Sequence, residues 1–175
     1  IGAYFRSDLD AAEEGYLEAL RLVQEVAPGS PSELNMLANL GLLAKRRGDF
    51  ATAWEYYERV LQAAERLGTD TLQYGNTSNL LGVLAKDMGR YEQARRHYEQ
   101  ALASFRAISP GGVDVAGVLN NLGNLAQNQD DLTAARRYHE EALALRRQLD
   151  PDGTDVASSL HNLGMVARKQ DDLAS

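Results

Sequence analysis

Hydrophobic residues recur along this chain at the spacing of an α-helix. Leu37, Leu40, Gly41 and Ala44 stand at i, i+3, i+4 and i+7, which places them on one helical face. After a short polar stretch, a second helical face is formed by Ala53, Tyr57, Val60 and Leu61. The pattern therefore predicts two helices joined by a tight turn, each with one apolar face.

The same two-helix pattern returns at a constant interval of 41 residues. A Leu-Gly pair ends at Gly41, Gly82, Gly123 and Gly164. In the second helix of each unit, small and aromatic positions keep this register, at Ala53, Ala94 and Ala135 and at Tyr57, Tyr98 and His139. Small residues let paired helices approach closely. Because neither helix can bury its apolar face alone, the units are expected to stack.

Turn residues divide the chain into units. Tight turns are predicted at 47–49, 88–90 and 129–131, and longer connections carry Pro and Gly. Ser32, Asp114 and Asp155 are the predicted N-caps of the following helices. We expect a single array with a partial unit at 1–26, full units at 32–67, 72–107 and 113–148, and a truncated unit at 154–175.

The two ends of the chain lack a polar capping helix. Residues 1–6 are interpreted as the tail of a first helix, and residues 171–175 as the opening of a second helix. The first of the two helices in the last unit, around 156–169, would then leave apolar surface uncovered. Arrays of this kind normally protect such surface. We therefore expect further repeats or domains to flank this segment.

The Leu-Gly pair followed by Ala-x3-aromatic resembles the tetratricopeptide repeat over essentially the whole chain. The chain departs from the common pattern in its period of 41, and in having Leu37 and Ala44 where the family has Trp and Tyr. The long period, Asn-Asn-Leu-Gly at 120–123 and Asp-Val-Ala at 114–116 resemble the kinesin light chain subtype, which also occurs in bacterial multidomain regulators. The resemblance implies an all-α, right-handed superhelix of antiparallel helix pairs, with about nine to ten helices and no sheet.

The resemblance further implies that the first helices line a concave groove where partners bind. The groove positions are rich in Asn, whose amide offers both donor and acceptor and could hold a peptide backbone. Lys or Arg in the same set could receive acidic groups, as could Lys169. The candidate groove residues are Asn39, Lys45, Asn79, Lys86, Asn120, Asn121, Asn124, His161, Asn162 and Arg168. Alternatively, the asparagines are structural and bond to the neighbouring helix.

A chaperone-type carboxylate clamp is not matched. That clamp needs Lys three residues before the Gly of the Leu-Gly pair. This chain has Ala38, Asn79, Asn120 and His161 there. Binding to chaperone tails is therefore not expected.

Composition argues against several other functions. The net charge is −7, from 18 Lys and Arg against 25 Asp and Glu, which does not favour nucleic-acid binding. The doublets 95–96, 136–137 and 146–147 lie among Glu residues and are interpreted as a solvated face with helix-surface ion pairs. No apolar run approaches membrane-spanning length, and no cysteine is present.

No catalytic or cofactor motif is found. The three histidines, His97, His139 and His161, lack metal-ligand spacing, and His139 replaces a core-facing Tyr. No phosphate-binding loop or nucleophile elbow occurs. We expect neither enzymatic activity nor a cofactor or bound metal.

Three functional hypotheses remain open. The first is a cytoplasmic scaffold that binds a protein or peptide partner in the Asn-rich groove, with no role for nucleic acid or membrane. The second is a sensor or autoinhibitory arm of a larger, multidomain regulator, with an intramolecular partner domain. The third is an array that associates end to end with further copies of itself.

Overall fold

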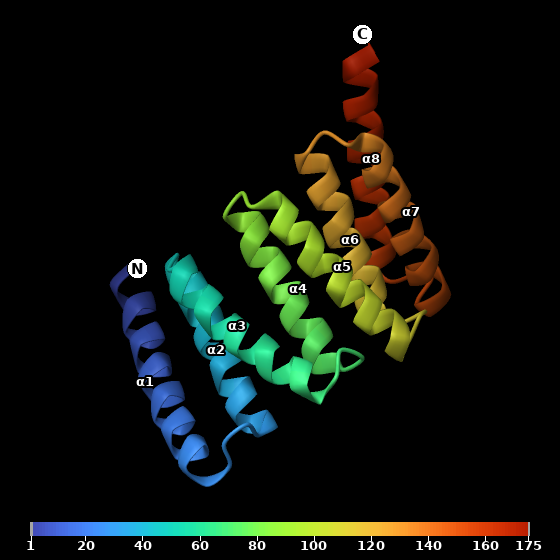
Figure 1. The fold of residues 1–175 in the computed structure, drawn as a ribbon. Coiled ribbons are helices and arrows are strands. Elements are labelled where there is room, and N and C mark those ends of the chain that lie inside the picture. Colours follow the sequence, from blue (N-terminus) through green and yellow to red (C-terminus); the bar gives the residue numbers. More distant parts are fainter. Residues whose placement is uncertain (1, 175) are drawn as a thin grey trace. The chain divides into compact units, whose positions relative to one another are not determined.

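The computed structural model describes the backbone of residues 2–174 and the side chains of residues 9–171. Within 2–174 the chain forms eight α-helices and no strand (Figure 1). They are α1 (Gly2–Val26), α2 (Pro31–Arg47), α3 (Phe50–Leu67), α4 (Leu72–Asp87), α5 (Tyr91–Ile108), α6 (Val113–Asn128), α7 (Leu132–Leu149) and α8 (Thr154–Ala174). The all-α prediction is confirmed.

The expected nine to ten helices are corrected to eight because both end helices run without a break. Residues 1–6 were expected to be the tail of a first helix and residues 171–175 the opening of a second helix, but α1 spans 2–26 and α8 spans 154–174. An internal turn is held in place by the second helix packing back on the first. In α1 and α8 the helix instead continues through the corresponding positions.

The three predicted internal turns are present and share one backbone conformation. Gly48 (φ 82°), Gly89 (φ 73°) and Asp130 (φ 59°) each occupy the left-handed region between two helices. This conformation ends a helix because it redirects the chain and satisfies its last carbonyls. The following helix is capped by Asp49 after the first turn and by Asp131 after the third.

The predicted N-caps of the first helices lie two residues too late in α2 and α6. The observed N-caps are Ser30, whose hydroxyl accepts from the Glu33 amide, and Gly112. Pro31 occupies the first position of α2, where its fixed φ suits a helix start. Asp114 and Asp155 instead lie in the first turns of α6 and α8, where carboxylates also favour a helix.

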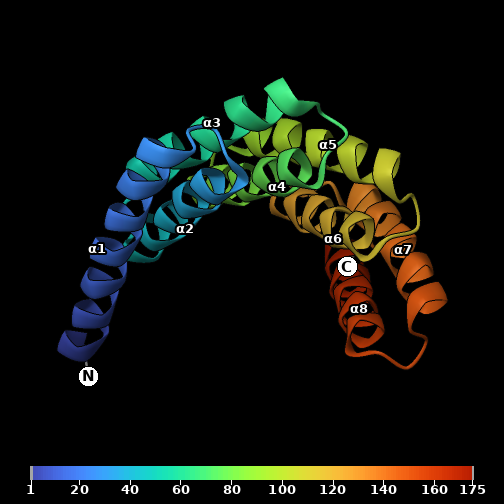
Figure 2. The ribbon, with the colours of Figure 1, turned by 90° about the horizontal axis from the view of Figure 1, so that it is seen from below.

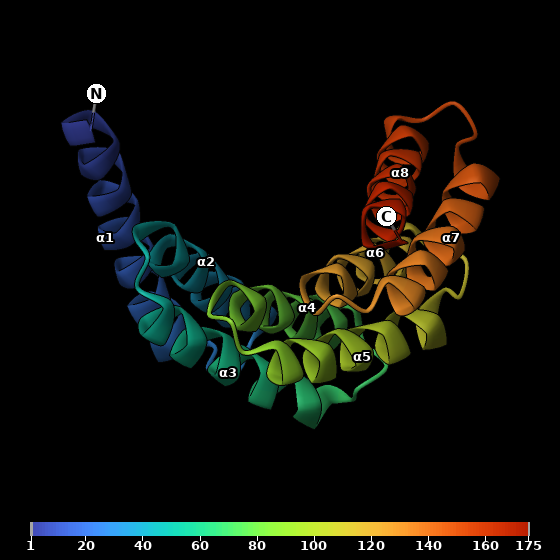
Figure 3. The same cartoon turned by 90° about the horizontal axis from the view of Figure 1, so that it is seen from above.

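The chain divides into two compact units, residues 1–68 and 69–175. Unit 1 holds α1 to α3, and unit 2 holds α4 to α8. In both units each helix packs against the next along the chain. Within unit 2, α4, α6 and α8 lie on one side and α5 and α7 on the other (Figures 2 and 3). We call α2, α4, α6 and α8 the first helices, and α1, α3, α5 and α7 the second helices.

Close packing within a helix pair depends on the glycine of the Leu-Gly pair. A Cβ on Gly41 would lie 2.5 Å from a ring carbon of Tyr57, and one on Gly82 would lie 2.5 Å from a ring carbon of Tyr98. Both rings are fully buried. The predicted role of the small positions is thereby confirmed, since any side chain at these glycines would force the two helices apart.

Candidate functional site

The asparagines of the first helices in unit 2 bond to one another. Asn121 Nδ2 donates to Asn79 Oδ1 at 2.9 Å, joining α6 to α4. Asn162 Nδ2 donates to Asn120 Oδ1 at 2.7 Å, joining α8 to α6. Both bonds run in the same direction between successive first helices. These four side chains therefore match the alternative in which the asparagines are structural and bond to the neighbouring helix.

The two amide pairs follow one geometric rule. In each pair the acceptor stands three residues before the glycine of the Leu-Gly pair, and the donor stands two residues before the next such glycine. The separation is thus 42 residues, one more than the repeat period. One amide from each helix therefore meets one from the next, and a continuous polar line crosses α4, α6 and α8.

These bonds leave part of each amide available. A side-chain amide has two N–H donors and an oxygen with two lone pairs. Asn79 and Asn120 use only the oxygen in the pairs, and Asn121 and Asn162 use one N–H each. All four residues are half-buried, so they remain accessible on this face. Each pair can therefore hold its side chains in place and still offer donors and acceptors to a ligand.

A shallow cavity of about 310 Å³ lies along this polar line. Asn79, Asn120 and Asn121 line it together with Asn76 and Arg146. The sequence interpretation missed the last two residues. Asn35 stands 41 residues before Asn76, so the repeat register held a signal for that position. Arg146 gave no such signal, because Phe105 and Ala64 occupy the equivalent positions.

Arg146 corrects the interpretation of the arginine doublets as a solvated face. Its guanidinium is half-buried and donates to Ser159 Oγ at 2.7 Å and to the Asp155 carbonyl at 3.2 Å. Arg95 is also half-buried and donates to Gln129 at 2.7 Å. These arginines bond to the next repeat rather than along their own helix. Arg96, Arg136, Arg137 and Arg147 are exposed as predicted.

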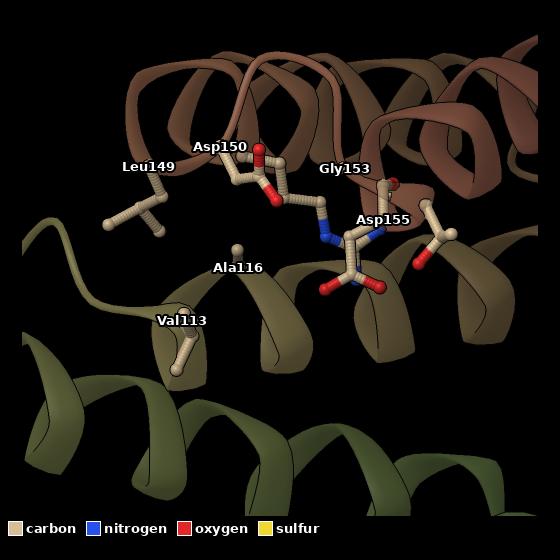
Figure 4. A pocket seen from close by; sticks show the side chains of 8 residues that line it. Val113, Ala116, Leu149, Asp150, Gly153 and Asp155 are labelled. Atoms are coloured by element: carbon tan, nitrogen blue, oxygen red, sulfur yellow. Dashed lines mark hydrogen bonds between the residues drawn. The ribbon is translucent and has the colours of Figure 1, made fainter.

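A second cavity of about 240 Å³ lies where the end of α7 and the start of α8 meet the start of α6 (Figure 4). Val113 and Leu149 form its apolar end, and Asp155 stands at the other end. Arg146 lines this cavity as well as the first. The two cavities therefore adjoin, and the polar line of asparagines ends beside an apolar recess.

The other predicted groove residues have varied surroundings. In unit 2, Asn124 is half-buried, whereas His161 and Arg168 are exposed. Lys86 lies 3.7 Å from the Asp87 carboxylate, and Lys169 bonds to Asp130 and to the Gln127 carbonyl. In unit 1, Asn39 lines a cavity between α1 and α2, and Lys45 is half-buried.

His139 is a packed core residue, as its place in the repeat predicted. Its ring is fully buried, and a Cβ on Gly123 would lie 2.5 Å from it. The ring Nε2 lies 2.8 Å from the side-chain amide nitrogen of Gln127. Burial, and to a lesser extent the charge of Arg146, lowers the pKa of His139 to about 4.

The described part of the chain shows neither a cluster of metal-ligating side chains nor a helix suited to cross a membrane. Among the residues with described side chains, no group of three or more His, Cys, Asp or Glu is placed to hold a metal ion. None of the helices described in 2–174 combines the length and apolar character that crossing a membrane requires.

Comparison with known proteins agrees with this architecture. The sequence model of the tetratricopeptide repeat matches residues 3–66, 32–107 and 114–175. No curated protein matches the chain in sequence. The crystal structure of BtubC (BKLC) from P. vanneervenii is 31% identical, with a TM-score of 0.87, and the match covers 97% of this chain and 69% of that one.

Two further structures resemble the chain in fold. A putative kinesin light chain with nearly identical TPR-like repeats from Podosopora anserina is 16% identical, with a TM-score of 0.80 over 95% of this chain and 81% of that one. A variant of that protein with a single substitution gives a TM-score of 0.81 at the same identity and coverage. The predicted resemblance to kinesin light chain-type repeats is confirmed at the level of the fold.

Proposed function

Because the chain belongs to the tetratricopeptide repeat family, we propose that it is a protein-interaction scaffold that binds an extended peptide across α4, α6 and α8. The fold itself supports protein interaction in general. The finer proposal rests on one observation, the two amide pairs that hold four half-buried asparagines in line with unused donors and acceptors. Amides fixed before binding lose little conformational entropy when a ligand arrives.

The spacing of the first helices suits an extended peptide backbone. Packed helices lie about 8–10 Å apart, and an extended chain rises about 3.3 Å per residue. Each first helix would therefore meet the peptide about every third residue. Amides would contact the backbone at these points, and the recess beside Val113 and Leu149 would accept an apolar side chain at the end of the line.

The proposal also covers the class of partner, the lack of catalysis and the location in the cell. The acidic net charge supports a protein partner rather than nucleic acid. The family is composed mainly of scaffolds, which supports a non-catalytic role. The lack of cysteine agrees with a cytoplasmic location. The predicted repeats at 32–67, 72–107 and 113–148 correspond, in this proposal, to the pairs α2–α3, α4–α5 and α6–α7.

The sensor-arm hypothesis uses the same face with a different occupant. In that hypothesis, a segment of the same polypeptide would occupy the polar line of asparagines until a signal released it. A peptide added in solution would then compete with that segment, so binding to the longer polypeptide would be weaker than binding to residues 1–175 alone.

Peptide selection followed by substitution tests the proposal. Peptides selected from a displayed random library would be titrated against the wild type, Asn124→Ala and Gln148→Ala. Asn124 lies on α6 outside both amide pairs, so its loss leaves the stacking bonds intact. Gln148 is an exposed amide on α7 and serves as the matched control. One lost hydrogen bond of about 1 kcal/mol weakens binding roughly fivefold for Asn124→Ala, whereas Gln148→Ala binds as the wild type does.

Equal affinity of all three proteins for every selected peptide would remove Asn124 from the proposed peptide-binding surface. Weaker binding by Gln148→Ala alone would move the site to the second helices. Circular dichroism of each variant establishes that the helices are retained.

A further inference from the structure

Gly117 lies in the interior of α6, where glycine makes a helix less stable than alanine would. Its backbone does not require glycine, because it has ordinary helical conformation without a positive φ. Its surroundings do not require glycine either, since beyond its own stretch of helix no described atom lies within 4 Å of a Cβ placed there. Gly82 and Gly123, by contrast, face buried rings. Neither backbone conformation nor internal packing therefore accounts for Gly117.

Gly117 lies on the face of α6 that carries the paired asparagines. It lines the cavity of about 310 Å³ with them and is half-buried. Asn120 and Asn121 follow it at i+3 and i+4, the spacings that share one helical face. In α2 and α4 the equivalent residues are Asn35 and Asn76, both exposed. In α6 this part of the cavity wall is therefore helix backbone instead of an amide side chain.

The same turn of α6 borders the apolar recess. Ala116 lines the recess, and the next residue, Gly117, lines the polar cavity. Val113, one turn earlier, lines both cavities, as does Arg146 from α7. Figure 4 shows Val113 and Ala116 on α6 at the edge of the recess. A ligand that occupies both cavities therefore lies against this turn of α6.

We propose that Gly117 is the point at which the main chain of the bound peptide contacts α6. This inference rests on the proposed peptide-binding function and adds the residue that fixes the path of the ligand. The missing side chain lets the ligand backbone reach van der Waals contact with the helix. One turn later, Asn120 and Asn121 offer their unused amide groups to the same backbone.

This contact favours an extended strand over a helix as the ligand. An extended strand exposes its main chain along its edges, and its side chains alternate between two faces. The side chains of a helix surround its backbone and hold it away from a partner. A partner segment that docks here is therefore expected to be extended where it crosses α6.

Two glycine-to-alanine variants test the role of Gly117. Gly15 is exposed in α1, and a Cβ placed on it also meets no described atom within 4 Å. Both variants are expected to unfold at the same urea concentration as the wild type or higher, because alanine favours a helix interior. Gly117→Ala is expected to bind a library-selected peptide roughly tenfold more weakly, since its methyl group takes the space of the ligand backbone. Gly15→Ala binds as the wild type does.

Isotope-filtered NMR gives a second readout on the unaltered protein. With the chain isotope-labelled and the selected peptide unlabelled, intermolecular nuclear Overhauser effects are expected between the α-protons of Gly117 and α-protons of the peptide. Contacts from Gly117 to peptide side chains alone would place a side chain here and overturn the proposal.

The outcomes separate this inference from the function on which it rests. If Asn124→Ala weakens binding and Gly117→Ala does not, the peptide binds without contacting Gly117, and the inference is wrong. Equal weakening by Gly15→Ala would overturn it as well, because the effect would then not be specific to the cavity. If no peptide is selected from the library, the proposed function fails and the inference fails with it.

Discussion

The glycine of the Leu-Gly pair and the ring that faces it define the contact inside each repeat. Tyr fills this place opposite Gly41 and Gly82, and His139 fills it opposite Gly123. The residue one turn after the glycine changes together with the ring: Lys45 and Lys86 accompany tyrosine, and Gln127 accompanies histidine. Gln127 bonds to the histidine ring, so the third pair is held by a polar contact inside an apolar core.

The buried His139 makes the stability of the protein depend on pH. Its pKa is about 4 in the folded chain and about 6.5 when unfolded, so between these values the unfolded state binds more protons. The free energy of unfolding is therefore expected to be at its full value above about pH 6.5 and to fall by about 3 kcal/mol as pH drops to about 4. Urea titrations across this range measure the loss.

His139→Tyr is the control for this prediction. It restores the residue found opposite the other two glycines and retains His97 and His161, so the difference between the two proteins isolates the buried ring. The variant is expected to lose less stability over the same pH range. An identical pH dependence in both proteins would show that His139 does not stay neutral in the fold.

For single residues, the sequence predicted the packing roles of the small and aromatic positions and the core location of His139, because these roles follow from the repeat register. It did not decide between ligand contact and stacking for the asparagines. The bonds join residues 42 apart, one more than the period. That offset depends on how successive helices are staggered, and no residue pattern in one chain records it.

Helix ends depend on local turn chemistry together with the packing that follows. Gly48, Gly89 and Asp130 adopt the left-handed conformation because a second helix folds back beyond each of them. Asp171 is the next position in this register, yet it lies within α8. The sequence motif for a turn is therefore not sufficient by itself, and this is one reason why the predicted number of helices was too high.

The three predicted N-caps, Ser32, Asp114 and Asp155, were wrong for a related reason. Ser, Thr and Asp are common both at the cap and in the first turn, so the residue type alone does not separate the positions. Pro31 held the missing signal, because a proline at the first helical position places the cap at Ser30.

The amide bond between Asn79 and Asn121 is expected to couple α4 to α6 energetically. A double-mutant cycle with Asn79→Ala, Asn121→Ala and the double variant measures this coupling by urea unfolding. The expected interaction energy is about 0.5–1.5 kcal/mol. Gains in helix propensity on replacing Asn by Ala cancel in the cycle.

The control cycle combines Asn79→Ala with Gln148→Ala. These residues lie on different helices, and neither bonds to the other, so their effects should add. Additivity in the Asn79–Asn121 cycle as well would mean that the amide pair does not contribute to the stacking of the two helices.

At the scale of the whole molecule, the same polar contacts recur between successive repeats of unit 2. Arg95 bonds to Gln129, and Arg136 bonds to Gln170, both across 34 residues. The two asparagine pairs repeat in the same way. Because each repeat contacts only its neighbours, stability in such an array is a sum of local contacts, and one repeat can change its surface without disturbing the others.

This locality explains which features of the molecule were predictable. The all-α fold and the pairing of helices followed from a pattern that every repeat shares. The sequence did not predict the positions of residues that differ between repeats and lie beside the polar line of asparagines, above all Arg146. Its equivalents are Phe105 and Ala64, and only the structure shows that its guanidinium reaches Ser159 on the next helix.

The most direct test of the peptide-binding surface is a titration of a library-selected peptide into the isotope-labelled chain, followed by NMR of the side-chain amides. The account predicts that the NH₂ signals of Asn79, Asn120 and Asn124 shift with a common saturation curve, while the exposed Gln148 on α7 stays unchanged. Shifts confined to α5 and α7, or saturation without any movement of these asparagine signals, would contradict it.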